Sequence, residues 1–140
     1  MPFDLERLIV PARDAPPLVR RAILILWVAV LVRGVDAVQL FMDREPETAG
    51  AAATIFGAAM FLAVAYGLLI LLASRRSGWA RHGLVMLLLG SAAILAAYLP
   101  SESPPWWDIE TVLAGLALEA IALHLLYRGP GARWYLQAAG

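Results

Sequence analysis

Residues 48–74 read TAGAAATIFGAAMFLAVAYGLLILLAS, a run of 27 residues without a charged side chain. A helix needs roughly 20 mainly apolar residues to cross the ~30 Å hydrocarbon core of a bilayer. This run is therefore long enough to span a membrane once and too short to span it twice. It also lacks the polar face that a helix on the surface of a soluble domain presents to water.

The rest of the chain has the same character. Of the 140 residues, 61% are hydrophobic and 16% are charged, and the mean hydropathy is +0.73. Soluble domains are nearer half apolar. Short polar connections separate four apolar segments, and short connections make neighbouring helices antiparallel. We therefore predict an all-α membrane protein with an antiparallel four-transmembrane-helix bundle over residues 18–128, its helices at about 18–42, 49–74, 80–100 and 108–127.

The two ends of the chain are predicted to lie outside this bundle, as an arm over 1–17 and a tail over 129–140. The arm has acidic residues and prolines before any apolar run, so it does not resemble a cleavable signal peptide. Apolar and charged residues interleave in its first half. Both a short helix on the membrane surface and a disordered tail are compatible with this pattern.

Arginine placement predicts the orientation of the bundle. Nine arginines fall on one side of a four-pass topology, namely Arg7, Arg13, Arg20, Arg21, Arg75, Arg76, Arg81, Arg128 and Arg133. Arg44 is alone on the other side, among six acidic residues. The positive-inside rule then places both termini in the cytoplasm. All eleven cations are arginine, which favours a bacterial source and hence the cytoplasmic (inner) membrane.

Aromatic residues mark both ends of the predicted helices. Trp79, Tyr127, Trp134 and Tyr135 lie on the arginine-rich side, and Phe41, Tyr98, Trp106 and Trp107 lie on the acidic side. Tyrosine and tryptophan are enriched where a bilayer meets water. We therefore expect these aromatic side chains to anchor the helix ends at the two interfaces.

Three charged residues, Arg33, Asp36 and Glu119, fall well inside the predicted spans rather than near their arginine-rich or acidic ends. Counted from the acidic side at 1.5 Å per residue, Arg33 lies ~13 Å deep, Glu119 ~15 Å deep and Asp36 ~9 Å deep. Ser91 of the third span reaches the same layer. A charge near the bilayer centre costs about 2.5–3.5 kcal/mol on insertion scales. These residues therefore need partners or a function.

Helix periodicity predicts which way each span faces. In the first span, one side carries Ala22, Leu26, Ala29, Arg33, Asp36, Ala37 and Leu40, and the other carries Leu24, Val28, Leu31, Val35, Val38 and Met42. The small and polar side should face the bundle and the bulky apolar side the lipid. In the fourth span, Glu119 shares a face with Val112, Gly115, Ala122 and Leu126. Small residues suggest further packing faces at Ala49, Ala53 and Gly57 and at Gly90, Ala93 and Ala97.

We expect Arg33 to pair with Glu119 across two helices and with Asp36 one turn away. Such a network is predicted to fix the register of the helices, as buried ion pairs often do. A second interpretation is a proton or ion path through Asp36, Glu119 and Ser91, because intramembrane ionisable groups mark transport routes. In a third, the first helix ends near Val32, and Arg33 snorkels to the acidic-side headgroups.

The two histidines, His82 and His124, are both placed near the arginine-rich surface. They are weak candidates for ligands to one haem or metal, since no carboxylate is positioned to orient either ring. The chain has no cysteine, which excludes thiolate metal sites and disulfides. No nucleotide, nucleophile-elbow or zinc-helix motif is present. No cofactor and no catalytic residue are therefore predicted.

The most economical functional interpretation is a structural or accessory membrane subunit without enzymatic activity. Its partners would be the lipid bilayer and either further copies of itself or a larger membrane complex. Nucleic acid is not expected, because topology and anionic lipid explain the basic rim. Two alternatives stay open: a small proton- or ion-coupled transporter that uses Glu119 and Asp36, and a redox or quinone-contacting subunit that uses the histidines.

Overall fold

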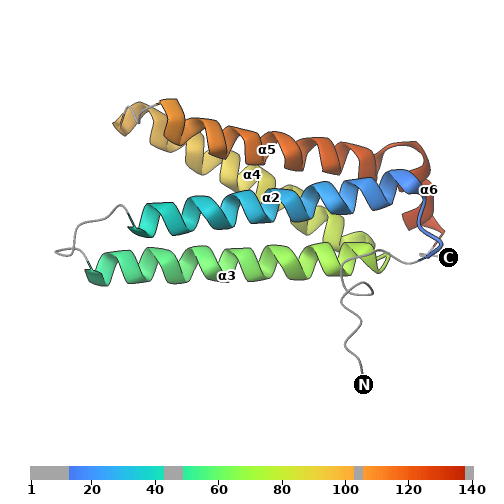
Figure 1. Ribbon diagram of the computed structural model, residues 1–140. Coiled ribbons are helices and arrows are strands. Elements are labelled where there is room, and N and C mark those ends of the chain that lie inside the picture. Colours follow the sequence, from blue (N-terminus) through green and yellow to red (C-terminus); the bar gives the residue numbers. More distant parts are fainter. Residues whose placement is uncertain (1–12, 43–48, 103–105, 138–140) are drawn as a thin grey trace, which may run out of the picture.

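The computed structural model describes residues 13–42, 49–102 and 106–137, and every regular element in these ranges is a helix (Figure 1). The five helices are α2 (Pro17–Met42), α3 (Ala49–Ser74), α4 (Gly78–Glu102), α5 (Trp106–Tyr127) and α6 (Gly129–Leu136). The prediction of an all-α chain is therefore confirmed. Any short surface helix within residues 1–12 lies outside the described part of the chain.

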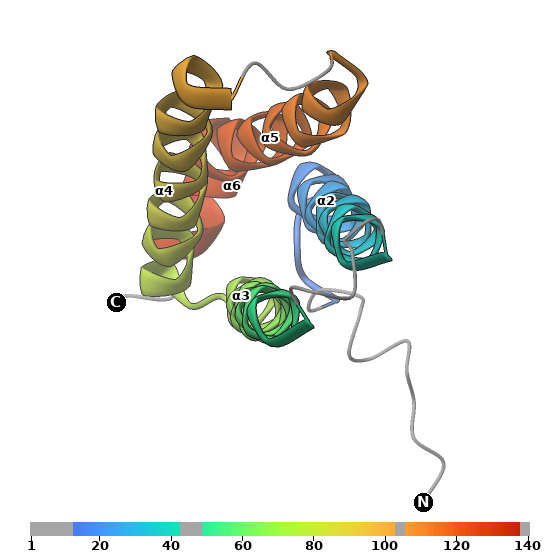
Figure 2. The ribbon, with the colours of Figure 1, turned by 90° about the vertical axis from the view of Figure 1, so that its left-hand side faces the viewer.

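The four long helices lie beside one another, and successive helices run in opposite directions (Figures 1 and 2). Helix α2 packs most extensively on α5 and also contacts α3, while α4 contacts α3 and α5. We call the end that contains the start of α2, the α3–α4 turn and α6 the arginine-rich end. The opposite end, where α2 finishes and α3 begins, is the acidic end.

Three of these helices are long and apolar enough to cross a membrane. The stretches are Phe56–Ser74 in α3, Gly78–Ala97 in α4 and Ile109–Tyr127 in α5. Little of each stretch is buried within the chain, so most of its apolar surface is available to lipid. This exposure supports a membrane location, because a soluble protein of this size rarely exposes such large apolar patches.

Helix α3 ends in a Schellman motif with an unusual residue. The Ser77 amide donates to the Leu72 carbonyl at 3.0 Å, and the Arg76 amide donates to the Ala73 carbonyl at 3.1 Å. This motif needs a left-handed residue, which is usually glycine. Here Arg76 occupies the position with φ of 70°. A bulky residue in this strained region must be held by its surroundings.

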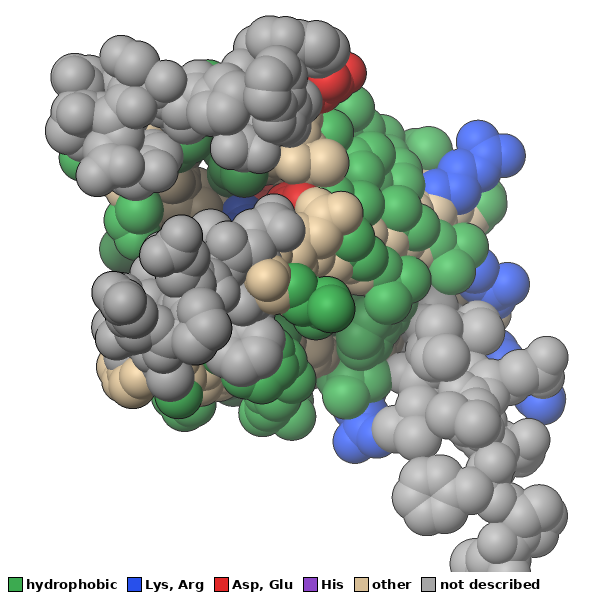
Figure 3. Space-filling view, turned by 60° about the vertical axis from the view of Figure 1, so that its left-hand side comes forward, with side chains coloured by type: hydrophobic (Ala, Val, Ile, Leu, Met, Phe, Trp, Pro, Cys, Tyr) green, Lys and Arg blue, Asp and Glu red, His purple; other side chains and the backbone are tan. Residues whose placement is uncertain are grey.

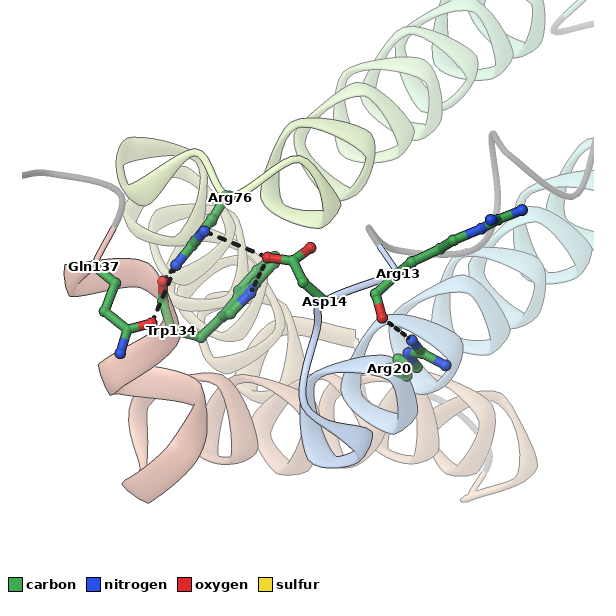
Figure 4. A network of polar contacts seen from close by, with 6 residues as sticks. All are labelled: Arg13, Asp14, Arg20, Arg76, Trp134 and Gln137. Carbon is green, nitrogen blue, oxygen red and sulfur yellow. Dashed lines mark hydrogen bonds and ion pairs between the residues drawn. The ribbon is translucent and has the colours of Figure 1, made fainter.

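Side-chain contacts of Arg76 stabilise this left-handed conformation (Figure 4). Its Nε donates to the Trp134 carbonyl at 2.8 Å, and its Nη1 lies 3.4 Å from Asp14. Its Nη2 donates to Gln137 at 3.3 Å, and the Trp134 indole also donates to Asp14 at 3.3 Å. The network ties the segment before α2, the α3–α4 turn and α6 together at the arginine-rich end.

The predicted facing of α2 is confirmed where its side chains are described. Ala22, Leu26 and Ala29 are fully buried. The opposite side is exposed, from Leu24 to Met42, with Leu31 at 68%. On α5, Gly115, Glu119, Ala122 and Leu126 are buried as predicted. The side chains of Ala37 and Leu40 lie outside the described set.

The small-residue faces predicted for the second and third spans are not buried within this chain. Ala53, Gly57, Gly90, Ala93 and Ala97 are all exposed, and Ala49 is not described. These small-residue faces are therefore not used for packing within this chain, and packing against another chain stays a prediction. Buried side chains of α3 and α4 instead gather near the arginine-rich end, from Tyr66 to Ser74 and from Ala80 to Leu84.

The tail after residue 128 contains helix α6, which docks back onto the bundle. The Arg81 guanidinium lies over the rings of Tyr127 and Tyr135, at 4.7 and 4.0 Å from their centres. Burial raises the pKa of the Tyr135 hydroxyl, so it stays protonated and donates to the Ala73 carbonyl at 2.6 Å. Gly131 permits this docking, because a Cβ there would lie 2.6 Å from the Leu125 carbonyl oxygen.

This docking also corrects the predicted aromatic belt at the arginine-rich end. Trp134 and Tyr135 are buried against the protein rather than exposed to an interface, while Trp79 is 63% exposed. The side chains of Phe41, Tyr98, Trp106 and Trp107 lie outside the described set. At the described end, two of the four aromatic residues therefore serve to hold α6.

We predict that Gly131→Ala detaches α6 from the bundle. The added methyl group meets fixed backbone atoms, so the free energy of unfolding should fall by about 1–3 kcal/mol. Thermal unfolding in detergent, followed by tryptophan fluorescence, measures the loss. Gly57→Ala is the matched control, because nothing lies within 4 Å of its added Cβ. It should be neutral or stabilising, and equal behaviour of the two variants would contradict the prediction.

Candidate functional site

An ion pair between α2 and α5 lies at the centre of the candidate site. The Arg33 guanidinium donates from Nε to one carboxylate oxygen of Glu119 and from Nη2 to the other at 2.9 Å. Glu119 has no exposed surface, and one third of the Arg33 side chain is exposed. This two-point geometry is the strongest arrangement available to an arginine and a carboxylate. Both oxygens of the buried acid are therefore neutralised by one partner.

Helix α4 joins the pair through Ser91. The Arg33 Nη1 donates to the Ser91 hydroxyl at 3.1 Å. The three nitrogen atoms of one guanidinium thus connect α2 to α5 and to α4. Helices α2 and α5 lie close at this level, since a Cβ added at Gly115 would be in van der Waals contact, at 3.9 Å, with the side chains of Val32 and Arg33. The structure thus brings together Arg33, Glu119 and Ser91, three residues that the sequence placed at one depth.

Tyr66 of α3 completes the ring of helices around the pair. The Arg33 guanidinium carbon lies 5.8 Å from the centre of the Tyr66 ring, within the range of a cation–π contact. The Tyr66 hydroxyl is buried and makes no hydrogen bond of normal geometry to the described residues, although it lies near the Glu119 carboxylate. A buried hydroxyl usually has a partner. This one is enclosed beside the Glu119 carboxylate, while Tyr66 also borders an adjoining space.

That space is a cavity of about 230 Å³ between the four long helices. We call it the central cavity. Its wall is mostly apolar, with four polar side chains, Arg33, Asp36, Tyr66 and Ser91, and apolar lining from residues such as Val30, Met60, Ala63, Leu87 and Val112. Figure 3, with the acidic end turned forward, shows a hollow with basic and acidic atoms in it, bordered by apolar side chains.

Asp36 lines the central cavity rather than joining the ion pair directly. Its carboxylate lies beside the Thr111 side chain and feels the charge of Arg33 one turn away. Helix α2 continues without interruption to Met42. The interpretation in which the first helix ends near Val32 and Arg33 snorkels outward is therefore wrong. The guanidinium turns inward because Glu119 offers it a better partner than the headgroups.

The two histidines do not take part in this site. His82 Nδ1 lies 3.0 Å from the Gly78 carbonyl of its own helix, and its ring packs edge-on against Tyr127. His124 is exposed on α5. Within the described residues, no cluster of three or more histidine, cysteine or acidic side chains could hold a metal ion. The described contacts therefore do not support a shared haem or metal.

Sequence reasoning missed two residues that shape the molecule. Tyr66 was overlooked because it stands within an apolar run, yet a tyrosine far from both ends of a span has no interface to reach and needs an internal partner. Arg81 was counted as one of nine cytoplasmic arginines, and no sequence signal set it apart. The structure shows it 8% exposed, with its Nη1 donating to the Leu126 carbonyl at 3.2 Å.

Comparison with known proteins gave no match: no family model, curated protein or solved structure is similar to this chain. Function must therefore be argued from the geometry described above.

We predict strong coupling between Arg33 and Glu119 in a double-mutant cycle. Arg33→Met or Glu119→Gln alone strands a buried partner and should lower the free energy of unfolding by roughly 3–5 kcal/mol. The double variant should recover much of that loss, because neither charge is then left alone. Thermal unfolding of the four proteins in one detergent gives the coupling free energy.

The matched control is the exposed pair of Arg76 and Asp14, whose side chains are 29% and 59% exposed. Asp14→Asn should cost less than about 1 kcal/mol, as expected for a surface ion pair. Purely additive losses at Arg33 and Glu119 would show that the two charges are not energetically paired.

Proposed function

We propose that this chain is a four-pass protein of the bacterial cytoplasmic membrane with both termini in the cytoplasm, and that it acts as a structural or accessory subunit. The observation that carries the proposal is the closed ion pair of Arg33 and Glu119. Its geometry suits a permanent connection between helices better than a group that exchanges protons.

In the proposed four-pass topology, α2 crosses the membrane together with α3, α4 and α5, the three helices that are long and apolar enough to do so. Helix α2 has 26 residues, lies alongside the other three (Figure 1), and turns bulky apolar side chains outward. The charge of Arg33 is neutralised by Glu119 within the chain, which removes much of its cost in lipid. Arginine side chains gather beyond the apolar band at one end of the molecule (Figure 3), and the positive-inside rule assigns that end to the cytoplasm.

The accessory role follows from how Glu119 is held. In a transporter, a carboxylate that carries a proton or an ion must bind it and then release it to water. Intramembrane acidic residues in such proteins therefore line the transport path. Glu119 is fully buried, and both of its oxygens accept hydrogen bonds from one arginine. Releasing them would leave two uncompensated charges in a medium of low dielectric constant. This arrangement favours a fixed structural role for Glu119.

The exposed small residues supply a surface for assembly. Gly57 of α3 and Gly90 and Ala93 of α4 face outward, with open space beside both glycines. Small side chains let the backbones of two membrane helices approach closely, which is how helices associate where lipid removes the hydrophobic driving force. We propose a second copy of this chain as the partner, because the subunit's own helices leave these faces uncovered.

The topology predicts a clear labelling pattern. Since the chain has no cysteine, single variants Arg13→Cys, Ser77→Cys and Gly50→Cys can be probed with a membrane-impermeant maleimide. Gly50→Cys should react in intact spheroplasts. Arg13→Cys and Ser77→Cys should react only after lysis. Labelling of Arg13→Cys on the same side as Gly50→Cys would show that α2 does not cross the membrane.

Self-association should depend on the small-residue faces. We expect Gly57→Leu and Gly90→Leu to weaken association of labelled chains in lipid vesicles by at least tenfold, measured by energy transfer over a range of lipid dilution. Leu89→Phe, at a position that is already bulky and 58% exposed, is the control and should have little effect. If the unaltered chain remains monomeric at every dilution, the proposed self-association is wrong.

A further inference from the structure

The central cavity leaves one charge unneutralised. The opposite charges of Arg33 and Glu119 cancel, because two nitrogen–oxygen contacts join the side chains. Asp36 lines the cavity outside that pair, with Thr111 as its side-chain neighbour. The three charges at this level therefore sum to minus one. A low-dielectric cavity strengthens the attraction of such an excess charge for a cation.

The Asp36 carboxylate is the group in the cavity that suits a cation with N–H donors. It lines the cavity, and an ionised carboxylate accepts hydrogen bonds through both oxygens and donates none. Its side-chain neighbour is Thr111. Tyr66 also lines the cavity, but its hydroxyl is buried beside the Glu119 carboxylate.

The volume and the lining of the central cavity restrict the chemical class of ligand that it can bind. An engineered protein cavity of about 150 Å³ holds one benzene ring, so about 230 Å³ accommodates one ring with a short substituent. The wall is mainly aliphatic, from residues such as Val30, Met60, Ala63 and Leu87. The described residues contain no cluster of metal-ligating side chains. These features favour an organic cation over a metal ion, which needs several oxygen ligands.

We infer that the central cavity binds a small organic monocation, whose ammonium group pairs with Asp36 and whose apolar body lies against α3 and α4. The ligand contacts Asp36 from within the cavity, so the Arg33–Glu119 ion pair remains intact while the ligand binds. The site is thus separate from the accessory role. Failure of binding would leave that role standing, and failure of self-association would leave the binding site standing.

The test uses the full chain in a neutral or zwitterionic detergent at pH 7, with ¹⁹F resonances of 4-fluorobenzylammonium as the probe. Its neutral and anionic counterparts of similar shape are 4-fluorobenzyl alcohol and 4-fluorobenzoate. We expect the ammonium to bind at least tenfold more tightly than the alcohol, and the benzoate not to bind. Equal affinity for the three compounds, or preference for the benzoate, would overturn the inference.

Two pairs of variants locate the bound probe. Asp36→Asn should weaken binding of the ammonium at least tenfold, whereas Glu110→Gln, the same change at an exposed acid of α5, should alter it less than twofold. Ala63→Phe fills the cavity and should abolish binding, whereas Ala58→Phe, at an exposed neighbour outside the lining, should not.

Each variant is accepted after thermal unfolding shows that it folds. If Asp36→Asn does not fold, the Ala63 and Ala58 pair still decides the location. Binding that survives Ala63→Phe, or that is unchanged in a folded Asp36→Asn, would show that the probe partitions into detergent or binds elsewhere, and would overturn the inference.

Discussion

A guanidinium buried at the middle of a helical membrane protein must satisfy its donors within the protein. Here Arg33 does so by reaching across to Glu119 on α5 and to Ser91 on α4, while Tyr66 of α3 covers it. These contacts link α2, α4 and α5 at one level, and each depends on how the helices are rotated and displaced relative to one another. In the structural role that we propose, the ion pair sets the register of these helices. Apolar packing alone constrains register weakly in lipid, because the tails are as apolar as leucine.

The arginine-rich end is fastened in a different way. There the buried apolar side chains of the described residues are densest, and α6 supplies Tyr135, whose ring stacks with Arg81 of α4 and whose hydroxyl donates to the end of α3. The polar contacts of Arg76 join the segment before α2 to Trp134 of α6 and to Gln137 (Figure 4). Among the described residues, the central cavity lies beyond this closely packed end, next to the Arg33–Glu119 ion pair.

The sequence predicted the helices, the shared level of Arg33, Ser91 and Glu119 and the outward face of α2, because each depends on local spacing. Helical periodicity says which residues share a side, and bulky Leu31 and Val35 mark the exposed side of α2. Periodicity could not say whether Gly57 and Gly90 face a neighbouring helix of the chain, because small and large apolar residues are equally acceptable to lipid. It gave no signal for the roles of Tyr66 and Gly131, which arise from contacts with distant helices.

The distance along the chain between the two ion-pair residues has a consequence for biosynthesis. Arg33 precedes Glu119 by 86 residues, which a ribosome adding 5–20 residues per second needs about 4–17 s to synthesise. During that interval Arg33 has Asp36 on its own helix, but not Glu119, to offset its charge. A helix with such a charge has a reduced tendency to leave the insertion machinery for lipid. If α2 spans the membrane, as we propose, it should therefore settle late, waiting at the translocon or the membrane surface until α5 emerges.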